Sequence, residues 1–369
     1  MKKTNVLSHS VAKEGPLLRR AQSSLMDTIH STLKGGSTMS MKRTKPGMIA
    51  LMGIMLLVFG VLPAAANPVL IKAHFTNNPG EPQIVAAELF KKIVEEKTNG
   101  DIKVEIYPNN QLGESRSVLE GIQLGTVQMA QVTGPMLSFV PELVVFELPF
   151  LFRDRDHMYA VMDSEIGKSL NASFEKRGFH SLGYGDVGVR HIMTVEKQIN
   201  SIDDLQGLKI RTMGNPAHLE AFKAFGANPL PMAYGELYTA LEQEVIDGAE
   251  AANINYESKK FYEPAPNWAQ VGWINLVGYT VLSKKLYDSL SPEYQQVIDD
   301  AAFEMNTLER KLYREKDENM LPELEKLGVK ITYPDRKPFM EASMKVYEAY
   351  ADKIPGGMDT INKIINFKN

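Results

Sequence analysis

The regular alternation of strand-like and helix-like segments early in the chain restricts the possible folds more than any other feature. Residues 68–75 (PVLIKAHF), 101–108 (DIKVEIYP) and 127–132 (VQMAQV) have the apolar content and alternation of strands. Residues 83–100 and 117–125, which lie between them, place apolar side chains at helical spacing. The order strand, helix, strand, helix, strand is typical of a largely parallel sheet covered by helices, so we expect an α/β fold.

Residues 41–66 have the three parts of a secretory signal: a cationic start, an apolar stretch at 48–62 and three alanines that end at Ala66. The apolar stretch has 15 residues, whereas a membrane-spanning helix needs roughly 20. We therefore expect a cleaved signal peptide, with cleavage near Ala66 and export to the periplasm; a retained anchor is the alternative. Residues 1–40 precede the signal, and we expect them to be untranslated or to lie outside the fold.

The charge balance changes once this leader is set aside. The whole chain has a formal net charge of −4, and residues 1–66, with nine Lys and Arg against two Asp and Glu, contribute +7. Residues 67–369 therefore carry −11, which makes nucleic acid or an anionic membrane a poor partner. The sequence contains no cysteine, and this excludes disulfides, thiolate catalysis and thiolate metal sites.

Residues 208–216 (LKIRTMGNP) predict a short strand followed by a helix. Leu208 and Ile210 alternate with polar neighbours, Asn215 is a suitable N-cap and Pro216 suits the first helical position. Arg211 would then lie at the carboxyl end of a strand and beside a helix amino terminus, which favours negative charge. This arrangement predicts an anion site, and a solvated surface arginine is the alternative interpretation.

Residues 179–195 contain Gly183, Gly185 and Gly188 in the G-x-G-x-x-G spacing of dinucleotide sites. That fingerprint requires a following helix, but the residues that follow are β-branched and alternating. We interpret the segment as strand, glycine-rich passage and strand, crossing between two lobes.

A long helix is predicted over residues 291–328, with Ser291 as its cap, Pro292 at its first position and Pro322 as a point of kinking or division. Shorter patterns complete this half of the chain. We expect helices at 218–226 and 256–263, a helix running into a strand at 234–250, and a strand at 329–334.

No catalytic or metal motif is visible in the sequence after the leader. Its five histidines lack a second histidine or a carboxylate at metal-binding spacing (His74, His157, His180, His191 and His218). No P-loop, nucleophile elbow or zinc-protease helix occurs. We expect no cofactor and no enzymatic activity. The competing class is a secreted enzyme for a carboxylated substrate, with Glu236, Glu250 and His74 as candidate acids or bases.

Two arginines in strand-like segments remain, Arg190 and Arg211, with Tyr234 and Tyr238 downstream. A guanidinium group offers a planar fork that matches a carboxylate with two parallel hydrogen bonds. In an acidic protein this pair predicts the centre of a carboxylate pocket.

Several dispersed motifs, in a fixed order, resemble those of one known family. They are YPNNQLG (107–113), EGIQLGTVQMA (120–130), LPFLF (148–152), SIDDLQGLKIR (201–211), GANPLPMAYGELYTALEQEVIDGAE (226–250) and KFYE (260–263). The sequence resembles the extracytoplasmic solute-binding proteins of tripartite ATP-independent periplasmic (TRAP) transporters, over essentially all of the chain after the leader.

This resemblance implies a ligand site between two lobes. Arg211 corresponds to the family's carboxylate-binding arginine, Arg190 to a second arginine and Tyr234 to an aromatic pocket position. Thr133 matches a position on the opposite lobe, and Thr76 and Glu114 match polar contacts of some members. Three further candidates for ligand binding lie near Arg211 and the DGAE stretch: Asn215, Glu250 and Asn253. Many members have an asparagine where this chain has Ala251, so one polar contact is missing or relocated.

The resemblance also implies hinge strands, a long helix spanning both lobes and membrane subunits of the transporter as partners. We expect residues 67–188 with about 277–316 to form lobe I, residues 189–276 with about 317–369 to form lobe II, and the protein to be a monomer. The ligand would be a small organic acid. Polar residues after the DGAE stretch favour a sugar acid such as a uronate, and a C4-dicarboxylate or a 2-oxo or hydroxy acid is the alternative.

Overall fold

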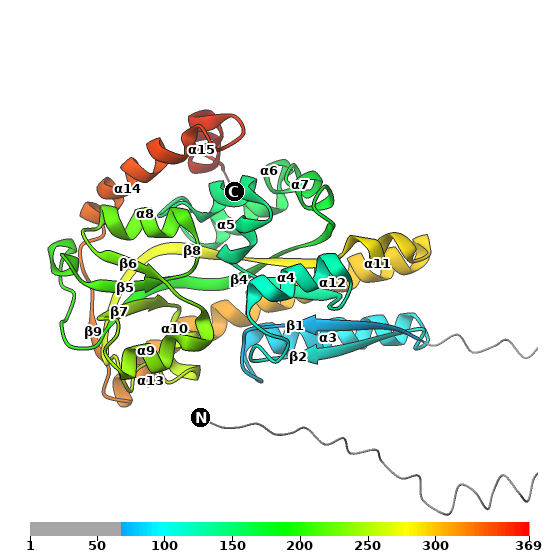
Figure 1. Cartoon of the computed structure of the whole chain (residues 1–369), viewed down its shortest axis with the longest axis horizontal. Coiled ribbons are helices and arrows are strands. Elements are labelled where there is room, and N and C mark those ends of the chain that lie inside the picture. Colours follow the sequence, from blue (N-terminus) through cyan, green and yellow to red (C-terminus); the bar gives the residue numbers. More distant parts are fainter. Residues whose placement is uncertain (1–67, 369) are drawn as a thin grey trace, which may run out of the picture. The chain divides into compact units, whose positions relative to one another are not determined.

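The computed structural model describes residues 68–368, so the predicted signal peptide and residues 1–40 lie outside the described residues. The described part forms a nine-stranded sheet in the order β2-β1-β3-β8-β4-β7-β5-β6, with β9 also paired to β8 (Figure 1). The strands are β1 (Val69–His74), β2 (Ile102–Tyr107), β3 (Met129–Val132), β4 (Phe179–Thr194), β5 (Lys209–Thr212), β6 (Asn228–Pro231), β7 (Gly248–Ala251), β8 (Asn267–Ser283) and β9 (Lys330–Thr332).

Parallel pairing is confined to the two ends of this sheet and to β9. β1 pairs in parallel with β2 and β3, and β5 pairs in parallel with β6 and β7. The centre is antiparallel, because β8 runs against β3 and β4, and β4 runs against β7. The expected α/β class is confirmed, but the sheet is mixed rather than largely parallel, since two long strands join its ends.

These two strands, β4 and β8, cross the whole middle of the molecule (Figure 1). The expected break at the glycine-rich passage was wrong, because β4 is continuous from Phe179 to Thr194 and absorbs its irregularity in three register shifts against β8. Gly188 lies within one shift at φ +87°, where a Cβ atom would come within 2.5 Å of the Ala252 Cβ. Only glycine fits this left-handed position and this close approach.

Helices cover the sheet, and the helix that follows β5 begins where the sequence predicts. Asn215 caps α8 (Pro216–Ala224) by accepting a hydrogen bond from the Ala217 amide at 2.9 Å, as expected. The other helices of eight or more residues are α3 (Pro82–Lys97), α4 (Ser115–Leu124), α5 (Arg155–Asp163), α12 (Pro292–Glu318), α14 (Lys337–Ala351) and α15 (Gly357–Ile365). Within residues 68–368, no helix is long and apolar enough to span a membrane.

The long helix α12 packs along α3 and β4, and so connects distant parts of the sheet. Ser291 caps it through the Tyr294 amide, and Pro292 opens it. It ends at Glu318, four residues before Pro322, and α13 (Met320–Lys326) follows. A proline ring clashes with the carbonyl four residues earlier, so the predicted division of this helix is confirmed.

A buried polar cluster lies where α12 passes under the sheet. The Glu309 carboxylate is fully buried and accepts hydrogen bonds from Gln131 Nε2 at 2.7 Å and from the Asp186 amide at 3.0 Å. Burial raises the pKa of Glu309 to about 8, the nearby Asp186 carboxylate adds to this effect, and the two hydrogen bonds and Arg310 oppose it.

This raised pKa predicts a pH-dependent stability. The pKa of Glu309 is near 4.5 in the unfolded chain and about 8 in the folded protein. Between these two pH values the folded protein keeps the Glu309 proton that the unfolded chain loses. The free energy of unfolding should therefore fall with rising pH in this window, by at most about 1.4 kcal/mol per pH unit. Glu309→Gln removes this pH dependence because the amide does not titrate. The melting temperature of the variant minus that of the parent should therefore increase from pH 5 to pH 8. The exposed Glu304→Gln serves as control, and a pH-independent difference for Glu309→Gln would contradict the assignment.

Candidate functional site

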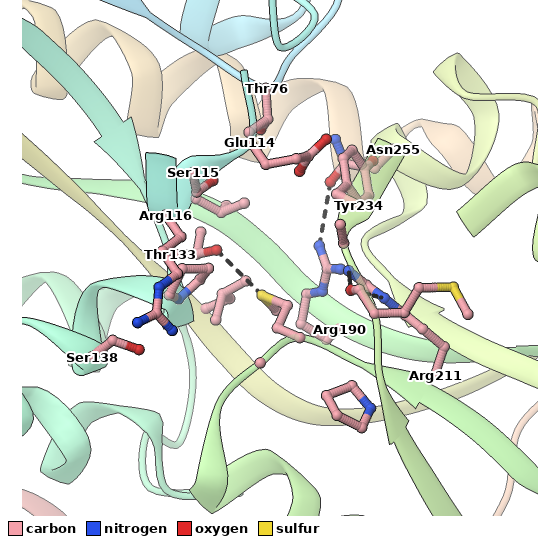
Figure 2. A pocket seen from close by; sticks show the side chains of 18 of the residues that line it. Thr76, Glu114, Ser115, Arg116, Thr133, Ser138, Arg190, Arg211, Tyr234 and Asn255 are labelled. Carbon is pink, nitrogen blue, oxygen red and sulfur yellow. Dashed lines mark hydrogen bonds between the residues drawn. The ribbon is translucent and has the colours of Figure 1, made fainter. Parts of the chain in front are cut away.

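Residues from both ends of the sheet surround a cavity of about 330 Å³ next to β4 and β8 (Figure 2). One side is formed after β1, at the start of α4 and after β3; the other is formed by β4, β5 and the segments after β5, β6 and β7. The lining residues are Thr76, Asn77, Glu114, Ser115, Arg116, Thr133, Pro135, Ser138, Val187, Arg190, Arg211, Met213, Gly214, Pro231, Met232, Ala233, Tyr234, Asn255 and Leu276.

Two buried arginines share one buried carboxylate at this cavity. Arg190 Nε donates to Glu250 Oε2 at 2.7 Å, and Arg190 Nη2 donates to the Glu250 carbonyl at 3.1 Å. Arg211 Nη1 lies 3.6 Å from Glu250 Oε1. Burial alone would lower the pKa of Arg190, but the Glu250 carboxylate outweighs this effect and raises it. One negative charge therefore faces two positive charges, which leaves one cation uncompensated within this group.

A backbone carbonyl holds the Arg211 guanidinium in place from one side, opposite to Glu250 Oε1. Its Nε and Nη2 atoms donate to the Met232 carbonyl at 3.0 and 2.8 Å. Its buried Nη1 has no hydrogen-bond partner among the described residues. Burial lowers the pKa of Arg211, the charge of Arg190 lowers it further and Glu250 opposes this, but a guanidinium stays charged at neutral pH because its ordinary pKa exceeds 12.

An aromatic ring lies beside this guanidinium. The Arg211 carbon Cζ is 5.8 Å from the centre of the Tyr234 ring, a distance at which the ring face attracts a cation. The Tyr234 hydroxyl is buried without a hydrogen-bond partner in residues 68–368, and burial raises its pKa. Figure 2 shows Arg190, Arg211, Tyr234 and Asn255 on the same side of the cavity.

The facing side carries hydroxyl groups and a carboxylate. Thr76, Glu114, Ser115 and Thr133 line it, and Figure 2 shows them opposite the arginines. Glu114 Oε1 accepts a hydrogen bond from Asn110 Nδ2 at 3.0 Å, and Thr133 Oγ1 donates to Met213 Sδ at 3.2 Å. The cavity thus offers a cationic side and a side of polar oxygen atoms.

Six of the nine predicted site residues line this one cavity: Arg211, Arg190, Tyr234, Thr133, Thr76 and Glu114. The structure places the other three outside its lining. Asn215 caps α8 and donates to Glu147 Oε2 at 2.8 Å, and Glu250 lies behind the two arginines. Asn253 Oδ1 accepts hydrogen bonds from Trp268 Nε1 at 2.8 Å and from Gln270 Nε2 at 3.0 Å.

Asn255, rather than Asn253, is the lining asparagine, and its Oδ1 accepts a hydrogen bond from Arg190 Nη1 at 3.3 Å. The sequence prediction began the helix at residue 256, but α10 spans Asn253–Ser258. Residues two apart on a helix point in different directions, and this spacing could have separated the two asparagines once the helix start was known. Asn77, Ser115, Arg116 and Ser138 also line the cavity and were not predicted.

The residues proposed for an enzymatic alternative do not meet at this cavity. His74 is fully buried, with its pKa lowered by burial to about 4, and Glu236 is exposed. Glu250 is engaged by the arginines. In residues 68–368, no group of three or more His, Asp or Glu side chains could hold a metal ion.

The shared carboxylate predicts a large effect of Glu250→Gln on stability. This change removes the counter-charge of two buried arginines, so the free energy of unfolding should fall by about 3–5 kcal/mol. Chemical denaturation at neutral pH measures this difference. Glu242→Gln, an exposed change of the same kind on α9 (Leu237–Glu242), should have little effect, and equal stabilities of the two variants would contradict the ion-pair assignment.

Comparisons with known proteins agree with the motif resemblance. A family model described as bacterial extracellular solute-binding protein, family 7, matches residues 73–353. The chain is 33% identical over 298 residues to the 2,3-diketo-L-gulonate-binding periplasmic protein of Escherichia coli K12, covering 80% of this chain and 90% of that protein. It is 31% identical over 309 residues to the C4-dicarboxylate-binding periplasmic protein of Rhodobacter capsulatus, covering 81% and 91%.

The solved structure of a TRAP periplasmic solute-binding protein from Pseudomonas putida F1 with bound D-glucuronate matches with a TM-score of 0.78 and 32% identity. This match covers 82% of the present chain and 98% of that one. The two-lobe α/β fold expected from the resemblance is confirmed. The chain belongs to the bacterial extracellular solute-binding proteins of family 7, the periplasmic receptors of TRAP transporters.

Proposed function

We propose that this protein is a periplasmic receptor for a small sugar acid with one carboxylate, which it delivers to the membrane subunits of a TRAP transporter. The observation that carries this proposal is the charge of the buried arginine pair: Arg190 and Arg211 both line the cavity and share the single carboxylate of Glu250. A ligand carboxylate beside the two guanidinium groups would neutralise the positive charge that Glu250 leaves uncompensated.

The charges around the cavity favour one carboxylate over two. Arg190 and Arg211 are balanced by Glu250 except for a single positive charge. Glu114 adds a fixed negative charge on the facing side, and a second ligand carboxylate near it would meet repulsion. A monocarboxylate therefore matches the cavity better than a dicarboxylate.

The remaining lining groups suit hydroxyl groups of a carbon chain or ring. Glu114 accepts hydrogen bonds, while Thr76, Ser115 and Ser138 both donate and accept. Tyr234 offers a ring beside Arg211 for packing against carbon atoms. The ligands named for the Pseudomonas putida and Escherichia coli relatives, D-glucuronate and 2,3-diketo-L-gulonate, are monocarboxylic sugar acids and support this assignment.

A C4-dicarboxylate, the ligand named for the Rhodobacter capsulatus relative, is the second candidate. Arg116 favours it, because this lining arginine could hold a second carboxylate. However, its side chain is 74% exposed and already lies 3.4 Å from Glu120, so it would bind a second anion weakly.

Transport requires capture and release rather than chemistry, and we propose that the acid leaves unchanged. Lobe I would comprise residues 67–188 with about 277–316, and lobe II residues 189–276 with about 317–369. Contacts from both lobes to one ligand would favour the closed state by their differential binding energy. Export would use the signal predicted at residues 41–66, and the receptor would act as a monomer.

Replacement of the anchoring arginine tests this function. Arg211→Met keeps the length of the side chain and removes its charge, so D-glucuronate binding should weaken at least 100-fold, which corresponds to about 3 kcal/mol. Isothermal titration calorimetry measures the loss, and circular dichroism checks that the fold is retained. Arg314→Met, a matched change at an arginine that pairs with Asp156 outside the cavity lining, should bind D-glucuronate as the parent does. Binding by Arg211→Met that stays within tenfold of the parent's affinity would overturn the assignment.

The negative charge of Glu114 should also influence which acid the cavity prefers. Glu114→Gln removes the negative charge facing the arginines, so the affinity ratio of D-glucarate, a dicarboxylate, to D-glucuronate should increase by roughly tenfold. Competition calorimetry with the two acids measures the ratio. An unchanged ratio would mean that Glu114 does not select against a second carboxylate.

A further inference from the structure

A second buried carboxylate, Glu81, joins the two sides of the cavity without lining it. Glu81 precedes α3 on the β1 side, is 1% exposed and accepts four hydrogen bonds. Two donors come from its own loop: Asn77 Nδ2 at 2.8 Å and the Asn78 amide at 2.9 Å. The other two come from α10, which follows β7: Asn255 Nδ2 at 3.0 Å and Ser258 Oγ at 2.9 Å. We call these five residues the Glu81 bridge.

Lys259 adds a parallel connection at the end of α10. Its ammonium group donates to Asn78 Oδ1 at 2.7 Å, to Asn109 Oδ1 at 2.8 Å and to the Thr76 carbonyl at 3.3 Å. It also lies 5.6 Å from the centre of the Tyr234 ring. Thr76 and Tyr234 line opposite sides of the cavity, so Lys259 contacts a lining residue on each side.

The Glu81 bridge continues to the anion-binding arginines. Asn255 donates to Glu81 through Nδ2 and accepts from Arg190 Nη1 through Oδ1, and Arg190 in turn binds Glu250. One amide therefore connects the bridge to the group that faces the ligand. Because a carboxylate that stays buried after losing a donor is left incompletely hydrogen-bonded, which costs free energy, this connection is strong only when all four donors are in place.

The strand order shows why the bridge depends on closure. β1 and β7 are separated in the sheet by β3, β8 and β4, so the loop after β1 and the helix after β7 meet only across these strands. If the two sides moved apart, all contacts across the cavity from three residues of the second side would break at the same time: Asn255, Ser258 and Lys259.

We infer that Glu81 is a positioning residue that holds the cavity closed and sets Arg190 through Asn255, so that it controls the rate of ligand release. This inference rests on the proposed function for its ligand, but the bridge itself can be tested without one. Since the bridge forms after the two sides approach, its loss should act mainly on dissociation.

The first experiment measures closure in the absence of ligand. The sequence contains no cysteine, so spin labels attached to Lys92→Cys on α3 and Gln243→Cys beside α9 report one distance. Both positions are exposed. In the parent, pulsed electron resonance should detect a short-distance population. Ser258→Ala and Lys259→Met should shift this population towards longer distances, whereas Lys260→Met, whose side chain is 66% exposed, should not.

The second experiment measures D-glucuronate kinetics by stopped-flow fluorescence on the same variants and on Glu81→Gln. Dissociation should accelerate by roughly tenfold in Glu81→Gln and less in the other two, while association changes by less than about threefold. The exposed Glu88→Gln on α3 controls for the loss of one charge. Melting temperatures identify any variant that fails to fold. If Glu81→Gln fails to fold, Ser258→Ala and Lys259→Met still test the bridge, because both residues are only half-buried.

Unchanged distances and unchanged dissociation in Ser258→Ala and Lys259→Met would overturn the inference. Slower association with unchanged dissociation in these two variants would also overturn it, because the bridge would then act before the cavity closes. If the parent does not bind D-glucuronate, the ligand assignment fails, and the distance measurement alone decides whether the bridge holds the closed state.

Discussion

The site depends on one carboxylate that two guanidinium groups share. Glu250 lies on β7, between β4, which carries Arg190, and β5, which carries Arg211. Coulomb interactions are strong in this buried environment, so the three charges hold the strands in a fixed relation while leaving the group short of one negative charge. The same arrangement thus stabilises the middle of the sheet and creates an attraction for an anion.

Much of the fold could be predicted because local signals agree with the final structure. The strands at 68–75 and 101–108, the Asn215 cap and the division of the long helix before Pro322 follow from alternation, capping and proline geometry. β8 was not predicted, because sixteen of its seventeen residues are buried and it therefore lacks the alternation of a strand with one wet face. The glycine within one register shift of β4, Gly188, lies against Ala252 and Tyr313, which are distant in sequence.

Some residues of the candidate site could likewise be predicted from the sequence, and others could not. Arg190, Arg211 and Tyr234 could be proposed from the sequence because a guanidinium fork matches a carboxylate and the family resemblance supported them, and all three line the cavity. Asn253 and Asn255 could not be separated, since the direction of each depends on where α10 begins. The role of Glu81 could not be predicted, because its four partners come from two segments of the chain, and its bonds to the second segment span 174 and 177 residues.

The register shifts of β4 have a mechanical meaning. Arg190 lies between the shift that ends at Val189 and the shift that begins after Arg190, on a strand that crosses from one end of the sheet to the other. A strand bends where its ladder is interrupted by an irregularity, so the bend of the crossing strand and the arginine proposed to bind the anion occupy the same place. Under the proposed function, a solute that binds Arg190 would also stiffen this bend of the crossing strand, so affinity and opening would vary together.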